Sequence, residues 1–86
     1  MKIYNSIEEY LPNAKKNDLM IFEGKGLMSG FDCICKYLTY KLISATTDKL
    51  TLKGYRSRNN SMLSTYNFNQ RVAILTKNEF NKLSIY

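Results

Sequence analysis

Eighty-six residues suffice for one domain with a modest core, and 44% hydrophobic with 23% charged residues is the composition of a globular protein. The chain has no histidine and two cysteines, so it lacks the commonest general base and the four ligands of a structural zinc site. We therefore predict a single basic domain, residues 1–86, that is not an enzyme and holds no cofactor or metal.

The net charge of +6 comes entirely from the middle of the chain. Residues 24–77 carry nine basic residues against two acidic ones, whereas residues 1–23 sum to −1 and residues 78–86 to zero. A basic segment attracts an anionic partner, such as nucleic acid, a membrane surface or an acidic protein, although a solvated surface that keeps a small protein soluble gives the same pattern. Met1–Asn5 lacks the apolar run of a signal peptide, and no stretch approaches the ~20 apolar residues of a membrane span. We expect a cytoplasmic protein with no membrane contact.

The first elements are a short helix and a buried strand. Ser6 and Glu9 have capping-box spacing, and Pro12 forbids continuation of the helix, so we expect a helix over Ile7–Leu11. Asp18–Glu23 is a short apolar run bounded by charges, typical of a buried strand. The Gly24–Gly30 stretch that follows is predicted to be a turn. It lacks both the third glycine of a dinucleotide-binding fingerprint and the Gly-Lys-Ser/Thr ending of a P-loop.

Residues 31–45 fit either a helix or a strand. Cys, Ile, Tyr, Thr and Phe dominate, which favours a strand, and a run of this length should bend or carry a bulge. On a strand, Cys33 and Cys35 would point to one face and pack in the core.

The two segments Lys36–Ala45 and Lys49–Arg58 are predicted to form a hairpin. Leu50 and Leu52 alternate with polar residues, the period of a strand with one buried face. Thr46–Asp48 is a turn-forming cluster whose side chains bond nearby backbone.

The remaining chain completes a mainly β fold, although an α+β class also fits. Ser61–Phe68 and Arg71–Leu75 are expected strands, Thr76 and Glu79 cap an expected helix over Lys77–Leu83, and Ser84–Tyr86 either pairs as an edge or frays. We predict a small curved antiparallel sheet or an SH3-like barrel with short N- and C-terminal helices. A homodimer is compatible with so small a core and exposed edge strands.

Basic and aromatic residues are interleaved in the central segment. Lysine and arginine neutralise phosphates, and tyrosine rings on a sheet stack unpaired bases at about 1–3 kcal/mol each, although half-buried sheet packing is the alternative role for each tyrosine. The predicted nucleic-acid-binding residues are Lys36, Tyr40, Lys41, Lys53, Tyr55, Arg56, Arg58 and Arg71.

In its ten lysines, nine asparagines, seven isoleucines and seven tyrosines, the chain resembles the small accessory proteins of T4-like phages. That resemblance implies a host-takeover or anti-defence protein that inhibits or redirects a host factor. We expect a non-enzymatic protein that binds RNA, a host ribonuclease or a toxin through a basic β-face and inhibits it. The alternatives are a protein–protein inhibitor or adaptor that docks on an acidic host enzyme without nucleic acid, and an enzyme with a lysine or tyrosine catalyst.

Overall fold

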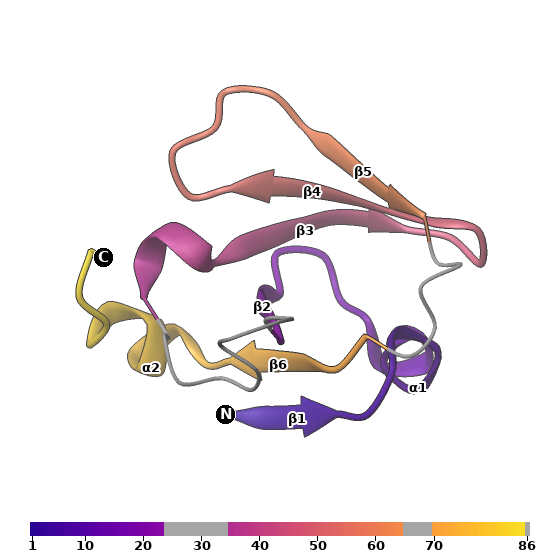
Figure 1. Cartoon of the computed structure of the whole chain (residues 1–86), viewed down its shortest axis with the longest axis horizontal. Helices are drawn as coiled ribbons and strands as arrows, with labels where there is room; N and C mark the ends of the chain where they lie inside the picture. The colour runs from indigo at the N-terminus through magenta and orange to yellow at the C-terminus, as the bar shows by residue number, and fades with distance from the viewer. Residues whose placement is uncertain (24–34, 65–69, 86) are drawn as a thin grey trace.

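The computed structural model describes residues 1–23, 35–64 and 70–85, in which the strands form one antiparallel sheet (Figure 1). The sheet order is β1-β6-β2-β3-β4-β5. The strand bounds are β1 Lys2–Tyr4, β2 Leu19–Phe22, β3 Tyr40–Ala45, β4 Lys49–Gly54, β5 Ser61–Ser64 and β6 Val72–Leu75. The helices are α1 Ile7–Tyr10 and α2 Lys77–Asn81, with 3-10 turns η1 Leu11–Asn13 and η2 Lys36–Leu38.

The predicted mainly β class with short N- and C-terminal helices is confirmed. The sheet is open, with β1 and β5 as its edges, so the curved sheet, and not the closed barrel, describes the architecture. Figure 1 shows β3, β4 and β5 in one half of the molecule and β6 and β1 in the other, with α1 and α2 at opposite ends.

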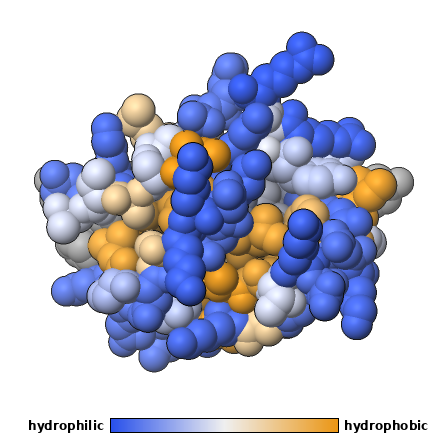
Figure 2. Space-filling view, turned by 180° about the vertical axis from the view of Figure 1, so that it is seen from behind, coloured by the Kyte–Doolittle hydropathy of each residue, from blue (hydrophilic) through white to orange (hydrophobic). Residues whose placement is uncertain are grey.

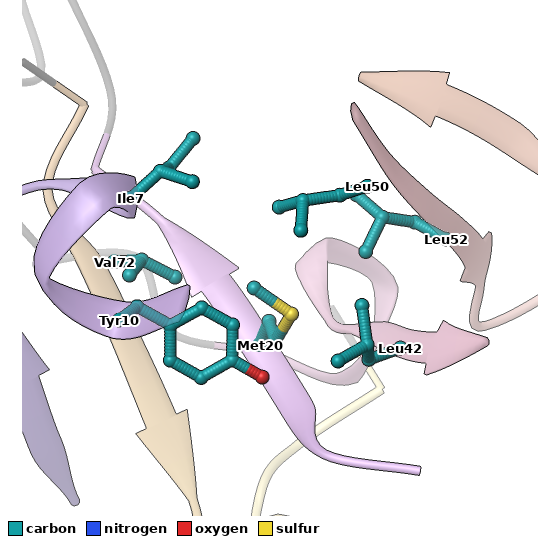
Figure 3. Close-up of a cluster of buried hydrophobic side chains, with 7 residues drawn as sticks. All are labelled: Ile7, Tyr10, Met20, Leu42, Leu50, Leu52 and Val72. Atoms are coloured by element: carbon teal, nitrogen blue, oxygen red, sulfur yellow. The ribbon is translucent and has the colours of Figure 1, made fainter. Parts of the chain in front are cut away.

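The core lies between the two halves of the sheet and is closed by α1 (Figure 3). Leu50 and Leu52 are buried, and they alternate along β4 with Thr51 and Lys53, as the period-2 pattern predicted. A fully buried leucine contributes about 1.5–3 kcal/mol. The buried cluster consists of Ile7, Tyr10, Met20, Leu42, Leu50, Leu52 and Val72. We call the side of the sheet that carries this cluster the core face and the other side the outer face.

The N-terminal helix α1 is shorter than predicted and continues as a different turn. The Glu9 N–H donates to Ser6 Oγ, as expected of a cap, while the Glu9 side chain accepts from the Asn5 N–H. Pro12 lies in the first turn of η1, where its missing N–H costs nothing. The Tyr10 hydroxyl donates a hydrogen bond to Asp18 at 2.6 Å. The pKa of Tyr10 is raised, mainly because the side chain is buried and secondarily because of this hydrogen bond.

The prediction of a strand starting at Lys36 was wrong. The Lys36 and Tyr37 N–H groups donate to the carbonyls of Ser84 and Ile85, at 2.9 and 3.1 Å. Residues 36–38 therefore form the 3-10 turn η2, and β3 starts only at Tyr40. Residues 31–34, with Cys33, lie outside the described residues, as does the Gly24–Gly30 stretch. Cys35 is buried, as expected, although it lies on no strand.

The hairpin itself follows the prediction, with one extra residue in β3. Thr46 Oγ1 accepts hydrogen bonds from the N–H groups of Asp48 and Lys49 in the expected turn. The register shifts by one residue between Leu42 and Ser44, which is the expected bulge and places the extra residue at Ile43. The second segment ends as a strand at Gly54, not at Arg58.

The C-terminal elements were predicted with small errors in length. Strand β5 covers Ser61–Ser64 of the expected strand, and residues 65–69 lie outside the described residues. Helix α2 ends at Asn81 and carries the complete predicted capping box. Strand β1 was missed, because three residues are too few for a period-2 pattern to be recognised. None of the helices in the described part of the chain has the length and hydropathy that a bilayer span requires.

Candidate functional site

The outer face of the β3–β4 hairpin carries a pair of lysines. Lys41 and Lys53 are register partners, next to the buried pair Leu42 and Leu52 on the core face. Directly opposite residues have Cβ atoms about 4.5–5.5 Å apart. The two lysine side chains therefore project from the same face of the sheet, next to each other.

The bulge at Ile43 creates this pairing. Near the turn, Ala45 faces Leu50 and Ser44 faces Thr51. If that register continued, Leu42 would face Lys53, and an apolar residue would share a face with a charged one. The extra residue shifts the register by one, so that leucine faces leucine in the core and lysine faces lysine outside. Bulges re-aim side chains in this way.

Three aromatic rings from separate segments meet beside the lysine pair. Tyr55 makes edge-to-face contacts with Tyr37 and with Phe80, at ring-centroid distances of 5.9 and 5.8 Å. We call Tyr37, Tyr55 and Phe80 the aromatic cluster. Each end of the cluster carries a cation: the Arg56 guanidinium lies 4.3 Å from the Tyr37 ring centroid, and Lys36 Nζ lies 5.7 Å from that of Phe80. Such contacts stabilise by about 0.5–1 kcal/mol at exposed sites.

Each segment of the aromatic cluster is fixed by its own backbone bonds. The turn after β4 is closed by the Ser57 N–H, which donates to the Gly54 carbonyl at 3.1 Å and so presents Tyr55. Turn η2, with Tyr37, is held by the C-terminal backbone as described above. Helix α2, with Phe80, begins at the Thr76 capping box directly after β6.

A cavity of about 240 Å³ lies between the lysine pair and the aromatic cluster. It is lined by Leu19, Thr39, Tyr40, Lys41, Lys53, Gly54, Tyr55 and Phe80. Thr39 is buried, and its hydroxyl donates to the Cys35 carbonyl. Lysines from β3 and β4 and aromatic rings from β3, the turn after β4 and α2 thus line one cavity. We call it the lysine pocket.

The electrostatics of the lysine pocket are uncompensated within the described part of the chain. No ion pair between a described carboxylate and Lys41 or Lys53 is formed there; the ion pairs recorded among these residues join Arg71 to Glu23 and the N-terminal ammonium to Glu79. Hydrogen bonds from that ammonium and from the Thr76 backbone lower the pKa of Glu79 to about 2. Glu79, the carboxylate next to Phe80 in sequence, therefore pairs with the N-terminal ammonium and does not neutralise the lysine pair.

Six of the eight residues predicted from the sequence come together at the lysine pocket and the aromatic cluster: Lys36, Tyr40, Lys41, Lys53, Tyr55 and Arg56. Tyr40 lines the pocket, and its ring also packs against Phe22 at a centroid distance of 5.8 Å. Two residues, Arg58 and Arg71, lie elsewhere. Arg58 is exposed in the loop after β4.

Arg71 lies at the far end of the strands from Lys41. It precedes β6, whose last residue, Leu75, faces Leu19, the register partner of Lys41. At about 3.3 Å per residue, four residues separate Arg71 from that level by roughly 13 Å. Its guanidinium lies 3.5 Å from a Glu23 carboxylate oxygen.

Sequence reasoning did not identify Phe80 as a site residue, since it was expected only as part of the helix over Lys77–Leu83. Tyr37 lies in the same basic and aromatic segment but was not among the predicted site residues. Both contact Tyr55 across long separations in sequence, and no local pattern signals such a contact.

Figure 2 shows the surface from behind, where a central hydrophobic area is crossed and surrounded by hydrophilic side chains.

No group of three or more Cys, Asp or Glu residues that could hold a metal ion occurs in the described ranges. Comparison with known proteins brought no relative: no protein-family model, curated sequence or solved structure matches this chain.

Proposed function

We propose that the protein binds single-stranded RNA through the lysine pocket and the aromatic cluster, and that it does so without catalysing a reaction. The observation that carries this proposal is the juxtaposition of four cations with three aromatic rings on one side of the hairpin. Lys36, Lys41, Lys53 and Arg56 supply the cations.

Each part of the site has a role in this proposal. The cations contact phosphates and release counterions. Tyr55, which is 43% exposed, offers a ring on which an unpaired base stacks, worth about 1–3 kcal/mol. A duplex keeps its bases stacked on one another and offers no free base to the ring, so a single strand is the better ligand.

The number of cations sets the expected salt dependence. For single strands, log K falls with log salt with a slope of about −0.7 per phosphate neutralised. Four contacts give a slope of about −2.8, so raising the salt from about 50 to about 200 mM should weaken binding about 50-fold.

Fluorescence anisotropy with a labelled mixed-sequence RNA of about ten nucleotides tests the proposal. We expect the Tyr55→Ala variant to bind about tenfold more weakly and Tyr55→Phe to bind like the wild type, because the phenyl ring still stacks. The Lys49→Gln variant is the matched control: Lys49 lies on the same strand and face as Lys53, and its Nζ contacts Met62 Sδ at 3.9 Å, away from the pocket. DNA of the same sequence and an RNA duplex are the comparison ligands.

The absence of binding at micromolar protein, or an affinity that does not change with salt, would refute the proposal. A partner that co-purifies from cells after nuclease treatment would instead favour an acidic protein as the ligand. If RNA is the ligand, coverage of the strand would inhibit an enzyme that acts on it, which is the inhibitory role that we propose for the protein.

A further inference from the structure

The geometry points to the lysine pocket as a site for a phosphomonoester at the end of an RNA strand. This inference rests on the proposed function, and it adds that the pocket distinguishes a strand terminus from the internal phosphates of the chain.

The first argument is the charge of the pocket. Lys41 and Lys53 are directly opposite on the sheet and line one pocket, so two positive charges lie side by side rather than being spaced along one strand. An internal phosphodiester carries a single negative charge, whereas a phosphomonoester carries about −1.5 to −2 near pH 7 and three acceptor oxygens. The terminal group therefore matches the two ammonium groups in charge, and its three oxygens provide an acceptor for each of them.

The second argument is the cost of the lysine pair. Like charges directly opposite each other on a sheet are destabilising, and no described carboxylate relieves this pair. A dianion between the two ammonium groups would convert the repulsion into attraction. Binding of a phosphomonoester therefore relieves the repulsion between the two lysines that is present in the free protein.

The third argument is the size and lining of the pocket. Its volume of about 240 Å³ is below the roughly 300–1,000 Å³ of pockets for drug-sized ligands, so it suits one phosphate with its sugar and not several nucleotides. Tyr55 and Phe80 line the pocket together with the lysines. They place an aromatic surface where the base of the terminal nucleotide follows the phosphate.

The test is competition of three unlabelled RNA octamers of one sequence, with a 5′-phosphate, a 3′-phosphate or only hydroxyl ends, against a labelled reference RNA. We expect one phosphorylated octamer to bind about tenfold more tightly than the hydroxyl octamer, and the two arms identify which end enters. Lys41→Gln and Lys53→Gln should each reduce that preference to below twofold. Lys49→Gln, with the same change of charge, should keep it.

A pH comparison gives a second measurement that needs no variant. The second pKa of a phosphomonoester is about 6, so the preference should shrink between pH 7.5 and pH 5.5 as the terminal phosphate gains a proton. The charged and titratable groups around the pocket are Lys41, Lys53, Tyr40 and Tyr55, with Lys36 and Arg56 beyond the aromatic rings. The chain has no histidine.

The outcomes separate the two proposals. Equal affinity for all three octamers overturns the terminal-phosphate site and leaves RNA binding in place. A preference that survives in both Lys41→Gln and Lys53→Gln overturns the assignment to this pocket. If no octamer competes and the reference RNA itself does not bind, both proposals fail.

Discussion

Replacing Lys41 with glutamate would put opposite charges where two lysines now face each other across β3 and β4. At a separation of roughly 6 Å, Coulomb's law in water gives about 0.7 kcal/mol for the pair. With the Debye length of about 8 Å at 0.15 M salt, screening reduces this to about 0.3 kcal/mol. Changing repulsion into attraction therefore stabilises the fold by about 0.7 kcal/mol, or about 3–6 °C in Tm for a domain of this size.

The same substitution should weaken RNA binding by about tenfold or more, because it removes a phosphate contact and adds a repulsive charge. Thermal melts of wild type, Lys41→Glu, Lys53→Glu and the double variant measure the coupling between the two positions. The double variant restores two like charges, so its Tm should return toward that of the wild type. In 1 M salt, where the Debye length is about 3 Å, the differences in Tm should shrink to about 1 °C.

The matched control is Lys49→Glu, since Lys49 has the uncharged Ser64 as its register partner. It should change Tm by less than half the Lys41→Glu shift and leave RNA affinity within about threefold. A lower Tm for Lys41→Glu at low salt, or an additive double variant, would show that the two lysines do not repel each other in the folded protein. Unchanged RNA affinity would remove Lys41 from the site.

Three further predictions concern the frame that supports the site. Tyr10→Phe should cost about 1 kcal/mol at pH 7 through the lost bond to Asp18. Because the folded pKa of Tyr10 is raised, wild-type stability should be complete below pH 10 and decline above it; Tyr10→Phe should lack this decline in melts from pH 8 to pH 11, and an equal decline would contradict the assignment. Leu50→Ala, at a fully buried position, should cost about 2–5 kcal/mol in urea unfolding, and a loss below 1 kcal/mol would contradict the packing in Figure 3. Thr76→Ala removes the cap of α2 and should cost about 1 kcal/mol, with a weaker RNA affinity because α2 carries Phe80; an unchanged affinity would place Phe80 outside the site.

What the sequence predicted well depends on local chemistry. Leu50 and Leu52 alternate with polar neighbours, and Thr46 can bond only to backbone close to it, so the hairpin and its turn could be read from short stretches. The capping box of Thr76 and Glu79 is also local, and it is present as predicted.

What the sequence could not supply depends on contacts between distant segments. Turn η2 replaces the start of a predicted strand because Ser84 and Ile85 accept its backbone bonds, and no pattern near Lys36 reveals them. The same holds for Phe80, whose contact with Tyr55 depends on the pairing of β6, the strand directly before α2, with β2. A bulge was expected between residues 31 and 45, but its position at Ile43, which sets the lysine register, could not be derived from propensities.

The register shift at the Ile43 bulge is required by the core, whereas the two lysines that it pairs are not. Leu42 and Leu52 are both buried, so the core demands the shifted register that pairs them. The same shift brings residues 41 and 53 together on the outer face, where any uncharged pair would satisfy the sheet at less cost than two lysines. Tyr55, directly after β4, is 43% exposed, and a small polar residue would form the same turn without exposing an aromatic ring. The lysine pair and the exposed ring lie within one pocket. Both features reduce the stability of the fold, and such destabilising features typically gather at functional sites.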